Sequence, residues 1–292
     1  MWLAVERGRS RNTLTAYRRD LHAYLAWLHA EGHDLESVTE ADVERYVAAQ
    51  RAEGRAPASV ARALVAVRTL HRFVADEAGG RDPAADVAPP KVPAGLPKPL
   101  DEAQVNALLD AVVGAEPVHR RDRAILELLY GTGMRISELC GLSIGAVDID
   151  AGLARVFGKG SKERIVPLGR PATAALTDWF GPGGRVAFVP RRWARRGDAE
   201  AVFLNQRGGR LSRQGAWSIV GTYGVRAGLG PRLSPHVLRH SCATHMVDHG
   251  ADIRVVQELL GHASISTTQV YTKVSTERLR AVYDAAHPRA RR

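Results

Sequence analysis

Apolar residues recur at the spacing of one helix face in three stretches near the N-terminus. They cover about residues 12–32, 39–54 and 59–79, and each stretch stops at a glycine. Side chains three and four positions apart share a helix face, so each stretch can bury one apolar stripe. This pattern predicts an all-α bundle of three helices at the N-terminus.

A proline-rich segment follows the third stretch. Residues 82–99, DPAADVAPPKVPAGLPKP, hold six prolines. Because proline fixes its own φ and restricts the residue before it, such a segment is stiff and extended. We therefore expect an N-terminal helical domain over 1–82, a linker over 83–100 and a second domain over 101–292. The chain is long enough for two separate cores.

The second part mixes helical and strand patterns. The helical patterns lie near residues 101–113, 119–130, 135–140, 171–180 and 212–227. Two runs of alternating apolar residues, Leu153–Phe157 and Arg164–Leu168, flank the sequence GKGSKE and predict a β-hairpin. Residues 181–200 are rich in glycine, proline and arginine and predict a flexible basic loop, whose role is left open between an extra phosphate contact and a disordered excursion. The expected class is mixed α+β, mainly helical, with a small antiparallel sheet.

The C-terminal stretch predicts three further helices. Ser234 followed by Pro235 is typical of a helix start, with serine as the N-cap. The next helix is expected to begin at Asp252 and to end at Gly261. A terminal helix is expected over residues 275–286, where apolar residues again show helical spacing.

Positive charge is concentrated beyond the N-terminal part. Residues 1–90 hold 12 Lys and Arg against 13 Asp and Glu, whereas the whole chain has a formal net charge of +10. The remainder therefore carries +11. A basic domain of this kind favours a polyanionic partner, although a solvated basic surface gives the same balance. Charge alone leaves both interpretations open.

Apolar runs and cysteines bear on the compartment. The longest apolar runs fall well short of the roughly 18 residues that a membrane span needs. The polar N-terminal residues do not predict a secretion signal. Cys140 and Cys242 are too few for a disulfide framework, so we expect both to be buried apolar residues in a reducing cytoplasm.

Candidate chemistry lies between Ser234 and Tyr271. His236 and Arg239 are three residues apart on the expected helix, so their side chains share a face. His262 follows the glycine that ends the next helix, and Tyr271 lies nine residues further on in the polar segment STTQVY. Two bases, one permanent cation and one phenol suit a reaction at a phosphate.

Several motifs occur in a fixed order along the chain. GTGMRISELCGL contains Arg135, VFGKGSKERIVPLG contains Lys159, and HVLRH, LLGH, STTQVYT and TERLR follow. In order and spacing these motifs resemble the tyrosine recombinases, closely those of the Xer type. The resemblance covers nearly the whole chain. Six candidate residues in order over 137 positions are far more specific than any one short motif.

The resemblance implies which residues act as nucleophile, general base and general acid. Tyr271 would be the nucleophile and would form a 3′-phosphotyrosyl link to DNA. Since a phenol has an ordinary pKa near 10, its proton must be taken, and His236 would be the general base. Lys159, in the turn of the hairpin, would protonate the departing 5′ oxygen. Lys162 beside it is the alternative, but the first lysine of GKGSK matches the family.

The remaining roles concern the charge of the phosphate. Arg135 and Arg239 would hold its non-bridging oxygens, and His262 would add a hydrogen bond. Glu138 is expected to brace the arginine or the helix, and His240 to support the structure. The resemblance implies no metal and no nucleotide cofactor, in keeping with the lack of a Walker loop or an acidic cluster.

DNA contacts outside the reaction centre are also expected. Arginines on the N-terminal helices fit a solvated face or phosphate contacts equally well, and the resemblance to a SAM-like core-binding domain favours DNA. The expected DNA-binding residues are Lys162, Arg164, Arg11, Arg18, Arg68 and Arg72.

The resemblance further implies an assembly. Two domains joined by a strap would close around duplex DNA carrying a palindromic-type site, and related protomers would form a cyclic heterotetramer that exchanges strands. The implied role is chromosome dimer resolution at cell division, in the cytoplasm at the nucleoid, with activation by a DNA translocase. Family members carry a short lead-in before the position of Met1, so the start of the chain is left open.

Four rival functions share part of this evidence. A phage or plasmid integrase shares all the local chemistry, and a type IB topoisomerase-like enzyme shares it but works alone. A metal hydrolase is the third rival, because the pairs His236/His240 and His245/His249 have the spacing of helical zinc ligands. However, no HExxH glutamate accompanies them. A non-catalytic DNA-binding protein would explain the charge and leave the motifs coincidental.

Overall fold

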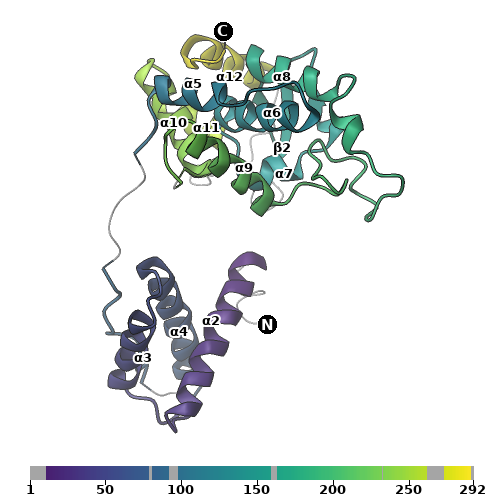
Figure 1. The fold of residues 1–292 in the computed structure, drawn as a ribbon. Helices are drawn as coiled ribbons and strands as arrows, with labels where there is room; N and C mark the ends of the chain where they lie inside the picture. Colours follow the sequence, from purple (N-terminus) through teal and green to yellow (C-terminus); the bar gives the residue numbers. More distant parts are fainter. Residues whose placement is uncertain are drawn as a thin grey trace. The chain divides into compact units, whose positions relative to one another are not determined.

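The computed structural model describes residues 11–78, 81–91, 98–158, 163–231, 233–261 and 273–290 (Figure 1). The chain divides into two compact units, residues 1–96 and 97–292. The candidate residues Lys159, Lys162, His262 and Tyr271 lie outside the described residues.

The N-terminal unit is built from three helices, α2 (Arg11–Ala30), α3 (Glu40–Ala52) and α4 (Pro57–Ala78). Thr39 caps α3, because its side chain accepts from the Asp42 backbone while the Asp42 carboxylate accepts from the Thr39 backbone. The three helices bury one shared core. Its largest fully buried members are Tyr24, Tyr46, Leu28 and Leu64.

The start of the proline-rich segment packs into this unit. Ala84 and Val87 are almost completely buried in the N-terminal core. Arg68 of α4 donates hydrogen bonds to both of their carbonyl oxygens. The segment expected to be linker from residue 83 onward is therefore part of the N-terminal core up to Val87.

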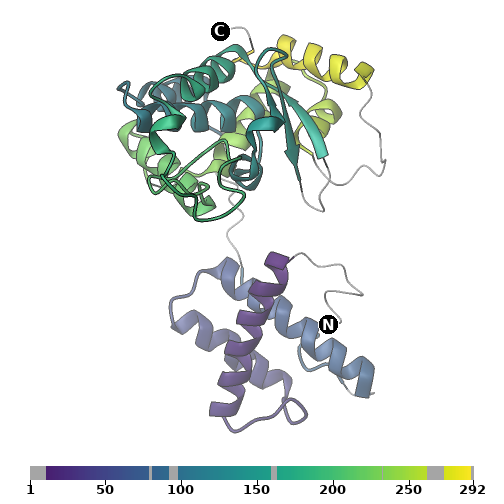
Figure 2. The ribbon, with the colours of Figure 1, turned by 90° about the vertical axis from the view of Figure 1, so that its right-hand side faces the viewer.

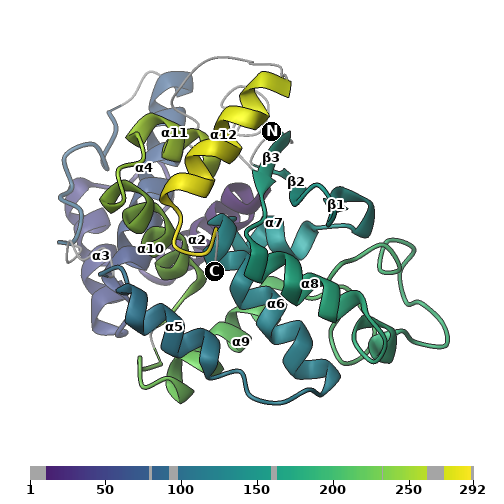
Figure 3. The same cartoon turned by 90° about the horizontal axis from the view of Figure 1, so that it is seen from above.

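The second unit is mainly helical. Its helices are α5 (Glu102–Asp110), α6 (Pro117–Thr132), α7 (Ile136–Gly141), α8 (Arg170–Phe180), α9 (Arg213–Arg226), α10 (Pro235–Asp248), α11 (Ile253–Leu260) and α12 (Lys273–Ala286). α6 is buried on every side from Ala124 onward, as expected of a helix that is apolar all round. It contacts α5, α7, α8, α9 and α10, and Figure 3 shows it between α8 and α10.

A three-stranded antiparallel sheet stands beside the helices, in the order β1 (Val147–Asp148), β2 (Leu153–Phe157) and β3 (Glu163–Pro167) (Figure 2). In the β2–β3 hairpin, Arg155 lies opposite Ile165. β1 was not predicted, because two residues are too short to show an alternating pattern.

These elements confirm the expected fold class: an all-α N-terminal part, and a mainly helical second part with a small antiparallel sheet. Both cysteines are buried and unpaired, as expected. Among the described residues, none of the helices combines the length and the apolar character that crossing a membrane requires.

Candidate active site

Arg135 is placed by the junction between α6 and α7. Gly133 ends α6 in the left-handed conformation, with φ of 59°, and a Cβ there would lie 2.5 Å from Leu260 Cδ2. Glycine meets both constraints. Arg135 then occupies the N-cap position of α7, and the Glu138 carboxylate accepts from its backbone nitrogen at 2.8 Å and from its Nη1 at 2.9 Å. Glu138 thus braces both the arginine and the helix.

Arg239 reaches the same place from the second turn of α10. Pro235 opens this helix, although the Ser234 side chain makes no capping bond. Arg239 Nη1 donates to the Gly133 carbonyl at 2.6 Å, and its Nη2 donates to the Leu260 carbonyl at 2.6 Å. The two expected clamp arginines, which are far apart in sequence, therefore converge on one junction.

A third arginine completes this cluster from the sheet. Arg164 of β3 donates from Nη1 and Nη2 to the two oxygens of Glu138, at 2.6 and 2.7 Å. Its Nε donates to the Leu259 carbonyl at 3.1 Å. Arg164 is only 5% exposed. The expectation that Arg164 contacts DNA is therefore wrong, because its side chain is buried and bonds Glu138 and the Leu259 carbonyl.

The three arginines bind three successive carbonyls at the end of α11. Arg164 donates to the Leu259 carbonyl, Arg239 to the Leu260 carbonyl, and Arg135 to the Gly261 carbonyl at 2.8 Å. These carbonyls have no partner within the helix, and the C-terminal end of a helix attracts cations. Gly261 ends the helix with φ of 69°, and His262 follows it directly in the chain.

The cluster carries an excess of positive charge. Among the described residues, Glu138 is the only carboxylate that forms an ion pair with any of the three guanidinium groups. Burial would raise the pKa of Glu138, but the hydrogen bonds and charge of Arg164, with those of Arg135, hold it below its ordinary value. Three cations and one anion leave a net charge of about +2, the complement of an anionic ligand.

Arg239 contributes a stable part of that charge. Burial, together with the charges of Arg135 and Arg164, lowers the pKa of Arg239 to about 10. The guanidinium therefore stays protonated at neutral pH, despite the cost of confining like charges. A phosphate oxygen placed between Arg135 and Arg239 would relieve that repulsion.

His236 is exposed on α10, one turn before Arg239. The ring centroids of Trp217 and His236 are 6.4 Å apart, and the two ring planes meet at 70°. The other histidine pair is already engaged: His245 Nδ1 hydrogen-bonds Tyr130 at 2.9 Å, and His249 Nε2 pairs with Glu102 at 3.1 Å. No group of three or more potential metal ligands occurs within the described ranges.

The N-terminal arginines differ in their surroundings. Arg18 and Arg72 are exposed, whereas Arg68 is half-buried on the carbonyls of Ala84 and Val87. Arg11 is the first residue of α2, and its side chain lies outside the described part. Arg68 therefore braces the N-terminal core, which its spacing on the helix alone could not show.

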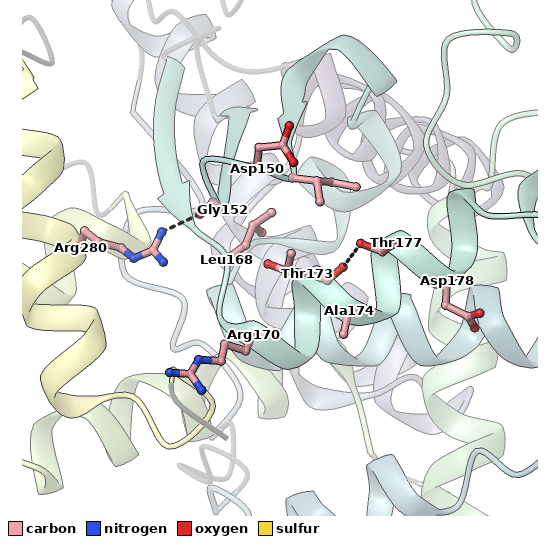
Figure 4. A pocket seen from close by; sticks show the side chains of 10 residues that line it. Asp150, Gly152, Leu168, Arg170, Thr173, Ala174, Thr177, Asp178 and Arg280 are labelled. Carbon is pink, nitrogen blue, oxygen red and sulfur yellow. Dashed lines mark hydrogen bonds between the residues drawn. The ribbon is translucent and has the colours of Figure 1, made fainter.

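An open pocket lies apart from the arginine cluster. Arg280 of α12 donates from Nη1 to the Gly152 carbonyl at 3.1 Å, while Thr173 and Thr177 of α8 line another wall (Figure 4). The residues that line it include none of the described catalytic candidates. The candidate active site is therefore the arginine cluster and not this pocket.

Replacing Arg164 with alanine should lower the free energy of unfolding by about 3–5 kcal/mol, the usual cost of breaking a buried ion pair. The change leaves Glu138 with one cation in place of two and frees the Leu259 carbonyl. Denaturant unfolding measures this loss. Arg155→Ala in the same hairpin is the matched control, because its ion pair with Glu163 is exposed and is worth under about 1 kcal/mol. Equal losses in both variants would contradict the bracing role.

The sequence matches known protein families and relatives over nearly the whole chain. Residues 98–278 match the model of the phage integrase family, and residues 2–78 match the phage integrase N-terminal SAM-like domain. The tyrosine recombinase XerD of Corynebacterium glutamicum is 47% identical over 298 residues, which cover 99% of this chain and 96% of that protein.

Solved structures give the same picture. The XerA recombinase is 28% identical with a TM-score of 0.51, over 96% of this chain and 94% of that one. The Tn1549 transposon integrase, solved with circular intermediate DNA, has a TM-score of 0.72 over 94% and 95% of the two chains. At 19% identity, this second likeness concerns the fold alone.

Proposed function

Because the chain belongs to the phage integrase family of tyrosine recombinases, we propose that it cuts and rejoins DNA strands with Tyr271 as the nucleophile. The enzyme is a site-specific DNA recombinase, and a DNA strand is its substrate. The observation that carries the mechanism is the preformed cluster of three guanidinium groups against one carboxylate.

The cluster suits the transition state of phosphoryl transfer. A DNA phosphodiester is already anionic, so an incoming phenolate is repelled, and in-line displacement spreads further charge over the non-bridging oxygens. Arg135 and Arg239 would each hold one of these oxygens with donors fixed before the reaction begins. Arg164 and Glu138 would act through them, by keeping the Arg135 guanidinium in place.

The reaction exchanges one ester bond for another. Tyr271 loses its proton to His236, and its oxygen forms a bond to phosphorus while the bond from phosphorus to the 5′ oxygen breaks. Lys159 supplies the proton that the 5′ oxygen needs in order to leave. His262 would donate a hydrogen bond to a non-bridging oxygen. A 5′ hydroxyl from another strand then reverses these steps and restores the DNA backbone.

The biological assignment is a finer part of the proposal. Relatives named XerD favour chromosome dimer resolution at cell division, in the cytoplasm at the nucleoid. We propose a cyclic tetramer with a related recombinase on a palindromic-type site, activated by a DNA translocase. A phage or plasmid integrase with the same chemistry is the alternative, and the target site distinguishes the two.

The proposal includes contacts away from the reaction. Lys162, which lies between β2 and β3 in the sequence, together with the exposed Arg18 and Arg72, would contact the DNA backbone. We propose an N-terminal domain that extends past residue 82 to Val87, a linker that ends at residue 100 and a catalytic domain over 101–292. Since Ala84 and Val87 pack in the N-terminal core, the span between the two cores begins beyond Val87.

Covalent capture tests this function. A nicked duplex loses the short 5′-hydroxyl fragment after cleavage, so the enzyme stays bonded to the 3′ phosphate. We expect the enzyme to form the covalent complex in EDTA and without an added nucleotide cofactor. It should do so on the normal substrate and on one with sulfur at the bridging 5′ position. Lys159→Ala should capture only the sulfur substrate, because a thiolate leaves without a proton. Lys162→Ala should capture both substrates.

The outcomes separate the parts of the proposal. Absence of any covalent product from the unmodified enzyme would overturn the function. Sulfur rescue of Lys162→Ala in place of Lys159→Ala would exchange the roles of the two lysines. Activity lost in EDTA and restored by zinc would favour a metal-dependent reaction.

A further inference from the structure

The basic loop, residues 181–200, has a defined path. Arg185 Nε donates to the Ala201 carbonyl at 2.9 Å, and its Nη2 donates to the Ala199 carbonyl at 2.7 Å. The Arg185 guanidinium also lies 6.0 Å from the centre of the Trp193 ring. One inward-facing arginine therefore ties the two ends of the loop together, where the composition had predicted flexibility.

A second inward-facing arginine ties the loop to α7. Arg210 Nη1 donates to the carbonyls of Cys140 and Leu142, both at 3.1 Å, and its Nη2 donates to Gly197 at 3.1 Å. Backbone bonds join the same places, since the Ile144 nitrogen donates to Glu200 at 2.8 Å. The loop is thus fastened to the C-terminal end of α7.

That attachment fixes the loop relative to the arginine cluster. α7 has six residues and begins next to Arg135, so at 1.5 Å per residue it separates the cluster from the loop anchor by about 9 Å. Figures 1 and 3 show the loop extending from one end of the helical body. A short rigid helix therefore connects the candidate phosphate site with a protruding segment.

The tip of the loop presents unpaired positive charge. Arg191, Arg192, Arg195 and Arg196 are all exposed. In the part of the chain that the structure describes, none of these four forms an ion pair or a side-chain hydrogen bond. Asp198 nearby is buried, at 6% exposure, and does not neutralise them. Four like charges within six residues repel one another, and a polyanion relieves that repulsion.

We propose that this loop binds the phosphate backbone of the DNA duplex that the enzyme cleaves, outside the reaction centre. The inference rests on the proposed function, because the substrate of the cluster is then the same duplex. DNA is favoured over an acidic protein, since a protein interface needs an apolar centre. Residues 191–197 expose no large apolar side chain, and the two exposed valines of the loop, Val186 and Val189, precede this arginine-rich stretch. The four arginines supply affinity without reading sequence, because they meet phosphates and not base edges.

Salt dependence of DNA binding tests the proposal. The fourfold variant R191S/R192S/R195S/R196S removes only exposed groups, so its unfolding should match that of the unmodified enzyme. On a duplex of random sequence, the slope of log affinity against log salt should fall by about 2–4, at roughly 0.9 per lost phosphate contact. The fourfold lysine variant is the control and should keep most of the slope, because lysine retains the charge.

Cleavage is measured on the same variants. At saturating DNA the serine variant should form the covalent complex at an unchanged rate, since the loop lies outside the reaction centre. An unchanged salt slope overturns the proposal, and unchanged DNA binding with lost protomer association assigns the loop to a protein partner. Failure of the proposed function would show differently, as absence of covalent product in the unmodified enzyme while the change in slope persists.

Discussion

Replacing Tyr271 with phenylalanine should abolish covalent capture of DNA altogether while leaving the affinity for duplex DNA unchanged. The phenol oxygen is the atom that bonds to phosphorus, and phenylalanine keeps the ring but lacks that oxygen. A labelled nicked duplex, separated on a denaturing gel, reports the covalent product, and retention on a native gel reports binding.

Tyr283→Phe is the matched control for this change. It also removes a single phenol oxygen, but Tyr283 is fully buried on α12 and cannot meet a phosphate. The control should form the covalent product at the rate of the unmodified enzyme. A covalent product that survives Tyr271→Phe would remove the nucleophile assignment.

Replacing either Arg135 or Arg239 with alanine should slow single-turnover cleavage by roughly 10²–10³-fold, the usual cost of losing one preorganised donor at a developing negative charge. Lysine at either position should recover only part of the rate, because a point charge cannot make the bidentate contact of a guanidinium. The rate is measured at saturating DNA, so that binding does not enter.

A substrate analogue separates this electrostatic role from a structural one. Arg239 also bonds the carbonyls of Gly133 and Leu260, so its loss lowers stability as well. A neutral methylphosphonate at the cleaved position removes one of the charges that the arginines would stabilise. The alanine variants should therefore lose much less rate on this analogue. An equal loss on both substrates would show that the arginines act only by holding the fold.

Local sequence signals predicted the helices well. Thr39 and Asp252 cap their helices with side-chain oxygens, and Gly261 ends α11 with a positive φ. Capping and glycine stops depend on a few neighbouring residues, so they can be read without a structure. The expected β2–β3 hairpin follows from an alternating pattern of the same local kind.

Contacts between distant segments could not be read in this way. The motifs marked Arg135 and Arg239, but their meeting at the end of α11 depends on how α6, α10 and α11 pack. Arg164 carried a signal that was available, because it lies two residues before the inward-facing Val166 in β3 and therefore shares its face of the strand. Its lysine-rich surroundings favoured a DNA contact, and the buried carboxylate of Glu138 that it meets lies on a different element.

The basic loop and the linker differed from prediction for a similar reason. Composition predicted flexibility over residues 181–200, but the bonds from Arg185 and Arg210 to backbone carbonyls give this loop a defined path. Proline content predicted a linker from residue 83, but Ala84 and Val87 are apolar and find room in the N-terminal core. Composition describes a segment alone, whereas these contacts need a partner.

Mass spectrometry of the captured complex identifies the residue that bonds to the phosphate. After nuclease and trypsin digestion, we expect the peptide from Val255 to Lys273 to carry a nucleotide joined to Tyr271 through its 3′ phosphate. His262 lies in the same peptide, and its phosphoramidate would be lost in acid, whereas a tyrosine ester would persist. A nucleotide on any other residue, or one joined through its 5′ phosphate, would show that Tyr271 is not the nucleophile of a 3′-phosphotyrosyl link.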